Sequence, residues 1–157
     1  MNESILLYDS LDPNRILLNS DIKSRKKLLQ TMASLLATGA DSEAVEKEIY
    51  QSLWEREKLG NTGIGNGIAL PHSRCAKIKR AIVAVISTSE GVDYDAIDNQ
   101  EVDLAFGLLV PEEATQDHLN LLAQIAKLFS DPSKKTKLKS AESAERVLTL
   151  VQNWMQE

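Results

Sequence analysis

The sequence predicts one α/β domain in which helices flank a mixed β-sheet. Two kinds of apolar spacing support this class and follow one another along the chain. One is the three- and four-residue spacing of helices, and the other is the continuous or alternating run of strands. The length of 157 residues suits a single domain with a substantial core, and the sequence has no internal repeat or low-complexity linker. We therefore expect residues 1–157 to form one domain.

The composition argues against several classes of protein. The net charge is −5, and an acidic chain is a poor nucleic-acid partner because phosphate backbones select basic surfaces. No apolar run approaches the roughly 20 residues that span a bilayer, and the N-terminus lacks a secretory pattern. The only cysteine, Cys75, leaves no internal disulfide and fits a reducing compartment. We expect a cytoplasmic protein with no direct membrane insertion.

The first forty residues predict a turn, a short strand and one clear helix. An apolar segment at 5–8 precedes the turn signal at 12–14, and residues 16–18 indicate a short strand. A helix follows Ser24, and Gly39 is expected to supply its left-handed C-cap. Its apolar positions recur at the helical period, at Leu28, Leu29, Met32, Leu35 and Leu36.

A second helix is expected to begin at a capping residue, either Asp41 or Ser42. One face of this helix is apolar, with Val45, Ile49 and Leu53. The helical pattern ends near residues 58–60, where Gly60 follows Leu59. The helix therefore leads directly into the most unusual stretch of the chain.

That stretch, residues 61–74, combines glycines, a short strand and a histidine. Glycines at the alternate positions 63, 65 and 67 remove side chains from one face of an extended segment. Residues 68–70 then predict a strand that Pro71 ends. A dinucleotide-binding loop has the opposite order, because it follows a strand and opens a helix. We expect another group to approach the backbone closely here, and the alternative is a flexible bend between helix and strand.

Two further strands are expected in the second half of the chain. Residues 81–86 are apolar throughout, as in a central strand covered on both faces. Residues 102–110 alternate between apolar and other side chains until Pro111 ends the run. Between them, residues 91–100 are rich in turn residues and indicate a hairpin.

Two helices are expected to complete the chain. A long apolar helix runs from about Asp117 to the break at residues 131–132, and a last helix is capped by Ser143. The main stripe of the long helix is formed by Leu119, Leu122, Ala123, Ala126 and Phe129, and it is widened by Leu121, Ile125 and Leu128. A helix that is apolar on most sides is expected between two layers. The apolar face of the last helix is formed by Val147, Leu150, Val151 and Trp154.

His72 is the strongest candidate for chemistry. It follows a proline at the predicted end of a strand, where side chains leave the core for an edge. A neutral imidazole is a competent nucleophile near pH 7. A phosphoryl group on it would need hydrogen-bond donors, which the backbone of the glycine stretch and an arginine, Arg56 or Arg74, could supply. The alternative is an ordinary surface or core histidine.

The other histidine, His118, lies at the predicted start of the long helix. A helix N-terminus has free N–H groups and partial positive charge, so it attracts anions. If this end faces His72, then His118 could contact the same phosphoryl group or orient His72. The alternative is a helix residue with no special role.

Other chemistry is weakly indicated. Two histidines and one cysteine match no zinc pattern, so we expect no metal. Cys75 is more typical of a small buried side chain than of a nucleophile. The carboxylates of the following segment indicate a loose acidic rim or simply solvated loop charge, and they are Asp93, Asp95, Asp98, Glu101 and Asp103.

The stretch from Thr62 to His72, Thr-Gly-Ile-Gly-Asn-Gly-Ile-Ala-Leu-Pro-His, resembles the active-site signature of enzyme IIA proteins of the fructose/mannitol class. These proteins belong to the bacterial phosphoenolpyruvate-dependent phosphotransferase system, and the nitrogen-related enzyme IIA is the most similar kind. The resemblance extends over nearly the whole chain. Further matching segments occur in the expected order, at residues 55–57, 96–100, 102–104, 108–111 and 118–119.

The resemblance implies a mixed, mainly five-stranded sheet flanked by helices, with no cofactor. It implies that His72 is phosphorylated through Nε2 by a histidine-containing phosphocarrier protein, which enzyme I charges from phosphoenolpyruvate. Arg56 would contact the phosphoryl group, and His118 would be a second active-site histidine that is not itself phosphorylated. The phosphate pocket would include Thr62, Gly65, Asn66 and Gly67. The pair Ser73-Arg74 departs from the glycine-containing pair that is common after the active histidine.

The resemblance also implies two kinds of output. Nitrogen-related members act as regulators whose phosphorylation state decides which partner they bind, including potassium-uptake proteins and sensor kinases. The alternative is a sugar-specific enzyme IIA of the fructose/mannitol type that passes phosphate to a IIB domain during import. Phosphorylation adds about −1.5 to −2 charges, which is enough to change a docking surface in either case.

Overall fold

The sheet contains six strands in the computed structural model, which describes residues 7–38, 43–113 and 115–156. The strands are β1 (Ile16–Ser20), β2 (Gly63–Gly65), β3 (Ile68–Ala69), β4 (His72–Cys75), β5 (Ile82–Val92) and β6 (Val102–Pro111). Their order is β1-β5-β6-β3-β2, and β4 also pairs with β6. β1 is parallel to β5, β5 is antiparallel to β6, and β3 and β4 both run parallel to β6. The predicted mixed sheet is confirmed, with one strand more than the five expected.

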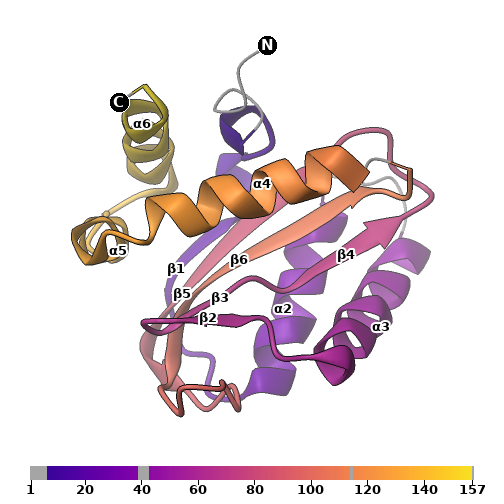
Figure 1. Cartoon of the computed structure of the whole chain (residues 1–157), viewed down its shortest axis with the longest axis horizontal. Helices are drawn as coiled ribbons and strands as arrows, with labels where there is room; N and C mark the ends of the chain where they lie inside the picture. The colour runs from indigo at the N-terminus through magenta and orange to yellow at the C-terminus, as the bar shows by residue number, and fades with distance from the viewer. Residues whose placement is uncertain (1–6, 39–42, 114, 157) are drawn as a thin grey trace.

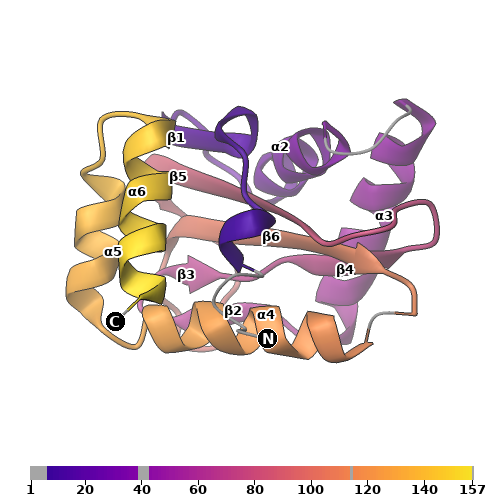
Figure 2. The same ribbon diagram turned by 90° about the horizontal axis from the view of Figure 1, so that it is seen from above.

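Helices cover both faces of the sheet (Figure 1). They are α2 (Arg25–Ala37), α3 (Glu43–Leu59), α4 (Thr115–Leu128), α5 (Pro132–Lys139) and α6 (Ala144–Met155), with a short 3-10 helix, η1 (Pro13–Arg15), before β1. Figure 2 shows α2 and α3 on one face of the sheet, and α4, α5 and α6 on the other. The single α/β domain with helices flanking a mixed sheet is therefore confirmed.

The alternation of side chains along β5 explains how one strand supports both layers. Ile82, Ala84 and Ile86 pack in the core with α2 and α3, whereas Val83 and Val85 pack in the core with α4 and α6. All five residues are buried. The apolar run at 81–86 is thus a central strand covered on both faces, as predicted.

The caps of the first two helices are only partly described. Ser24 caps α2, and its Oγ accepts a hydrogen bond from the Lys27 N–H at 3.1 Å. The residues expected to cap the end of α2 and the start of α3, Gly39 and Asp41 or Ser42, lie outside the described residues. At the other end of the chain, Ser143 caps α6 as predicted, and its Oγ accepts from the Arg146 N–H at 3.1 Å.

The predicted orientation of α4 is wrong. Its buried residues are Leu121, Gln124, Ile125 and Leu128, with Phe129 just after the helix. From the expected main stripe, Leu119 is 56% exposed, and Ala123 and Ala126 are exposed as well. The helix covers one face of the sheet and is not enclosed between layers. Apolar residues occur on most sides of this helix, so periodicity alone did not define which side packs.

Three further features differ from the expectation. The basic stretch after residue 131 forms the helix α5, whose Asp131 cap accepts from the Ser133 N–H at 3.0 Å. The hairpin expected within residues 91–100 is instead formed by the long strands β5 and β6, and that segment connects them. The strands β2 and β4 were not predicted, because glycines dominate the first and polar residues the second.

Gly107 in β6 faces Met32 of α2 in a tightly packed part of the core. A Cβ atom built on Gly107 would lie 2.2 Å from Met32 Sδ, and Met32 is fully buried. Gly107→Ala should therefore lower the free energy of unfolding by about 1–3 kcal/mol, measured by urea denaturation. Gly60→Ala is the control, because its Cβ would meet no atom closer than 3.9 Å. Equal urea midpoints for the two variants would contradict this account.

Candidate functional site

His72 is the first residue of β4, at a break between two strands that both pair with β6. β3 ends at Ala69, and β4 begins at His72 opposite Leu108. Pro71 stands in the break, and its carbonyl accepts from the Leu108 N–H at 3.0 Å, so pairing with β6 continues across it. His72 is partly exposed, whereas Leu70 and Pro71 before it are buried. The predicted end of the strand is therefore correct, but a second strand, β4, begins directly after Pro71.

Both ring nitrogens of His72 have assigned partners. Nδ1 lies 2.6 Å from the carbonyl oxygen of Leu70, which can only accept, so Nδ1 carries the proton. Nε2 therefore has the lone pair, and the Nε–H of Arg56 donates to it at 3.2 Å. This tautomer makes Nε2 the nucleophilic atom of the imidazole.

Arg56 reaches His72 from the last turns of α3. Its Nη1 also donates to the carbonyl of Gly60 at 2.7 Å, so the guanidinium bridges the end of its own helix and the imidazole. Of the two arginines left open by the sequence, Arg56 is the one in contact with Nε2, and Arg74 is exposed on β4. The structure thus brings Arg56 and His72 together.

The pKa of His72 is lowered from its ordinary value of 6.5. Burial is the largest cause, the hydrogen bond to Leu70 opposes it, and the positive charge of Arg56 lowers the pKa further while Glu57 raises it. His72 is therefore neutral at pH 7. A neutral imidazole whose lone pair is on Nε2 needs no prior deprotonation before it attacks an electrophile.

An NMR titration of the His72 ring proton Hε1 should give a midpoint below 6.5. Arg56→Gln should raise this midpoint, because it removes a positive charge beside the ring. Since the folded chain binds this proton less readily than the unfolded chain, the His72 contribution also makes stability fall as the pH drops below about 6.5. A midpoint at or above 6.5 in the unaltered protein would contradict the assignment.

Thr62 is connected to His72 indirectly, through Leu70. It is buried, its N–H donates to the Glu57 carboxylate at 3.1 Å, and its hydroxyl donates to the other oxygen of the same carboxylate. Its carbonyl accepts from the Leu70 N–H at 2.9 Å. Thr62 is therefore connected to the residue whose carbonyl binds His72.

Asn66 and Gly67 form the turn between β2 and β3, directly after Gly65 at the end of β2, and all three residues have positive φ angles. A Cβ on Gly67 would lie 2.6 Å from Lys135 Nζ, and the same amine donates to the Asn66 carbonyl at 2.5 Å. The group that approaches this glycine stretch closely is thus α5. Ile68 pairs with Leu104 and His72 with Leu108, so this turn lies about 13 Å or more from His72 along β6.

His118 lies in the first turns of α4, which begins at Thr115, close to the expected start. Its side chain lies outside the described residues. Cys75 is a free, buried cysteine, as expected for a small core residue. In the part of the chain that the structure describes, no group of three histidine, cysteine or acidic residues could hold a metal ion.

The expected acidic rim needs one correction. Asp93, Asp95, Asp98 and Glu101 are exposed in the connection before β6. Asp103, by contrast, pairs with Lys135 at 2.7 Å and with Lys139 at 2.5 Å. Burial opposes ionisation there, but these lysines lower the pKa of Asp103 overall. Asp103 therefore joins α5 to β6 and does not contribute to a rim.

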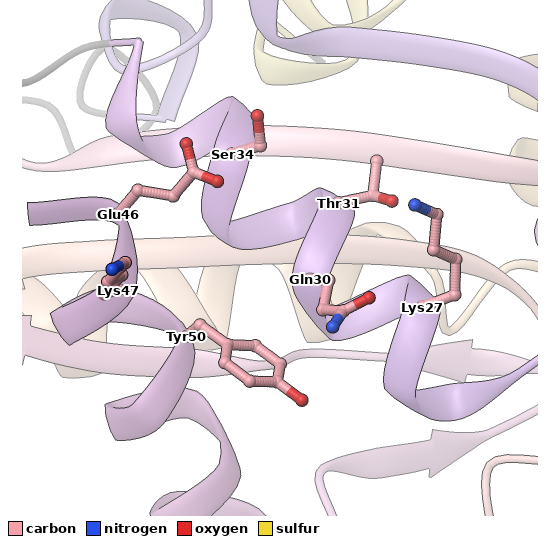
Figure 3. A pocket seen from close by; sticks show the side chains of 7 residues that line it. All are labelled: Lys27, Gln30, Thr31, Ser34, Glu46, Lys47 and Tyr50. Carbon is pink, nitrogen blue, oxygen red and sulfur yellow. The ribbon is translucent and has the colours of Figure 1, made fainter. Parts of the chain in front are cut away.

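A separate groove of about 440 Å³ lies between α2 and α3. Figure 3 shows that lysine amines and the Tyr50 ring surround it, and its lining residues are Lys27, Gln30, Thr31, Ser34, Glu46, Lys47 and Tyr50. It contains neither Arg56 nor His72. The chemistry proposed from the sequence is thus concentrated at the break between β3 and β4.

The sequence reasoning missed a polar cluster beside Thr62, formed by the buried residues Glu57 and Tyr94 and the partly exposed Arg25. One signal was available for Glu57. It continues the four-residue spacing of Ile49 and Leu53, so a glutamate lies on the apolar face of α3.

Comparison with known proteins supports the resemblance. Residues 9–154 match the family described as "Phosphoenolpyruvate-dependent sugar phosphotransferase system, EIIA 2". A "Nitrogen regulatory protein" of Pseudomonas aeruginosa is 43% identical over 147 residues, which cover 94% of this chain and 95% of that protein.

Two solved structures of enzyme IIA proteins have the same fold as this chain. The nitrogen regulatory protein IIA-Ntr of Neisseria meningitidis superposes with a TM-score of 0.86 at 38% identity, over 93% of this chain and 99% of that chain. The mannitol enzyme IIA of Escherichia coli, solved in complex with phosphorylated enzyme IIB, has a TM-score of 0.75 at 20% identity. The superposition covers 90% of this chain and 96% of the mannitol enzyme IIA chain. None of the helices in the described ranges is both long enough and apolar enough to cross a membrane.

Proposed function

Because the chain belongs to the EIIA 2 family of the phosphoenolpyruvate-dependent sugar phosphotransferase system, in its nitrogen-related branch, we propose that it is a phosphohistidine carrier with His72 as the acceptor. The phosphoryl donor is a histidine-containing phosphocarrier protein. One observation carries this proposal above the others. The Nδ1–H of His72 donates to the Leu70 carbonyl, so the lone pair is on Nε2, where the guanidinium of Arg56 contacts it.

In the transfer step, the Nε2 lone pair attacks the phosphorus atom of the donor's phosphohistidine. A new N–P bond forms on His72, the N–P bond of the donor breaks, and its electron pair returns to the donor imidazole. The Leu70 carbonyl stabilises the positive charge that develops on the His72 ring, because it accepts from Nδ1–H.

Arg56 changes partner during this step. Its Nε–H occupies the Nε2 lone pair in the resting protein, so it must leave as the new bond forms. The guanidinium is then beside the three phosphoryl oxygens, to which it can donate in a planar fork. Arg56 therefore both covers the unphosphorylated nucleophile and stabilises the product.

The remaining residues of the site have supporting roles in the proposal. His118 supplies a second imidazole at the start of α4, where helix N–H groups favour an anion. Thr62 supports the site through Leu70. The Gly65–Gly67 segment lies too far along β6 from His72 to contact a phosphoryl group there, so in the proposal it belongs to the surface that a partner covers.

The output of the carrier is regulatory in this proposal. The phosphorylation state selects partners such as potassium-uptake proteins or sensor kinases. The relative from Pseudomonas aeruginosa is named a nitrogen regulatory protein, which favours this output. The alternative is sugar import with transfer to a IIB domain, and the shared fold with the mannitol enzyme IIA that was solved with phosphorylated IIB supports it.

The test is reconstitution with phosphoenolpyruvate, enzyme I and the phosphocarrier protein. Intact mass should show one added phosphate that is labile to acid and stable to base, and omission of the phosphocarrier should prevent it. A second enzyme IIA protein serves as the positive control for the donor. If the control protein is labelled and this chain is not, the proposal is wrong.

A further inference from the structure

Glu57 is a carboxylate enclosed in the protein directly beside Arg56. Its side chain has no exposed surface, although it lies only two residues before the end of α3. Burying an ionised carboxylate is costly unless donors surround it. The described contacts of Glu57 show what compensates for this cost.

Four donors meet the two oxygens of Glu57. Oε1 accepts from the Thr62 N–H at 3.1 Å and lies 3.4 Å from Arg25 Nη2. Oε2 accepts from the Thr62 hydroxyl and from the Tyr94 hydroxyl, which is 2.7 Å away. Burial and the charge of Glu57 raise the pKa of Tyr94, so this hydroxyl keeps its proton and remains a donor. The acceptor capacity of the carboxylate is therefore filled.

Arg25 connects this cluster to α2. Its guanidinium carbon lies 5.1 Å from the ring centre of Trp54 and 5.2 Å from that of Tyr94. Both distances are within the range of cation–π attraction. The cluster thus joins the start of α2, the end of α3 and the segment that follows β5.

Two paths lead from Glu57 to the two nitrogens of His72. On the first, Glu57 is covalently linked to Arg56, whose Nε–H donates to Nε2. On the second, Glu57 binds Thr62, and the Thr62 carbonyl accepts from the Leu70 N–H at 2.9 Å. The Leu70 carbonyl then accepts from Nδ1 of His72. A single buried carboxylate is therefore linked to both groups that hold the imidazole, through hydrogen bonds on the Leu70 side and through the backbone of α3 on the Arg56 side.

We propose that Glu57 is a positioning residue that sets both hydrogen bonds of the His72 ring, with Arg25 and Tyr94 as its supports. Its described hydrogen bonds and ion pair go to Thr62, Tyr94 and Arg25, so it acts on the imidazole through Arg56 and Thr62. This inference rests on the proposed function for its effect on transfer. Its effect on the geometry of the resting site is independent of that function.

The main test compares Glu57→Gln with Glu55→Gln. Glu55 is exposed on another face of α3, so its substitution removes the same charge without touching the cluster. In Glu57→Gln, the Arg56 Nε–H NMR signal should exchange with solvent faster, and the Nε2 nitrogen shift of His72 should move. The rate of phosphorylation at saturating donor should fall about ten- to a hundredfold, as expected for a misplaced reacting group. Glu55→Gln should match the unaltered protein in both measurements.

Tyr94→Phe keeps the test valid if Glu57→Gln does not fold. It removes one donor to Glu57 and no charge, so the same two signals should move in the same direction, with about a fivefold loss of rate. Unchanged Arg56 and His72 signals in folded variants overturn the proposal. If the unaltered chain accepts no phosphate, the proposed function fails, but the NMR comparison still decides whether Glu57 positions the ring.

Discussion

His72→Ala is expected to abolish phosphorylation of the chain in the reconstituted system. The substitution removes the imidazole at the break between β3 and β4, and the neighbouring Ser73 hydroxyl is a much weaker nucleophile than a neutral imidazole with its lone pair on Nε2. The loss should exceed about a thousandfold in initial rate, so that no acid-labile phosphate is found by intact mass. Circular dichroism should be unchanged, because His72 is partly exposed and its removal leaves the pairing of β4 with β6 in place.

His118→Ala is the matched control for this experiment, since these are the two histidines of the chain. It should still be labelled, at a changed rate. Mapping the phosphate in the unaltered protein should place it on the peptide that contains His72. Full labelling of His72→Ala, or phosphate mapped to His118, would refute the division of roles between the two histidines.

Much of the fold follows from spacing alone. The alternating sides of β5, the cap at Ser24 and the apolar face of α6 were all predictable, because each depends on local pattern and elementary capping chemistry. The strands β2 and β4 were not predictable in the same way. Their stability comes from pairing with β3 and β6, and their own residues have no apolar pattern that predicts a strand.

The exposed side of α4 shows a second limit of predicting packing from residue spacing. Leu119, Ala123 and Ala126 have the spacing of a buried stripe, yet they face away from the sheet. Helical periodicity identifies a direction only when the opposite side is polar. Here Leu121, Ile125 and Leu128 define an equally apolar side, and this is the side that is buried against the sheet.

The site was predictable to a similar degree. The glycine stretch and the proline before His72 made this histidine the candidate nucleophile, and the resemblance favoured Arg56 over Arg74 as the arginine of the site. The contact at 3.2 Å now joins them. Glu57 was not identified, because a glutamate in a charged helical segment normally faces solvent, and only the fold shows four donors around it.

Arg56→Lys should lower the rate of phosphoryl transfer about a hundredfold, in the range found when one preorganised donor to a developing charge is removed. Lysine keeps the positive charge, but its ammonium group is a point donor and cannot bridge the Gly60 carbonyl and the imidazole as the planar guanidinium does. The resting ring should therefore lose its partner at Nε2, and the phosphorylated ring should lose a fork-shaped clamp. Arg74→Lys is the matched control, because it replaces an arginine by a lysine only two residues beyond His72. Arg74 is exposed on β4. Stopped-flow transfer from the phosphorylated donor would measure both variants, and equal rates for Arg56→Lys and Arg74→Lys would show that Arg56 is not the phosphate clamp.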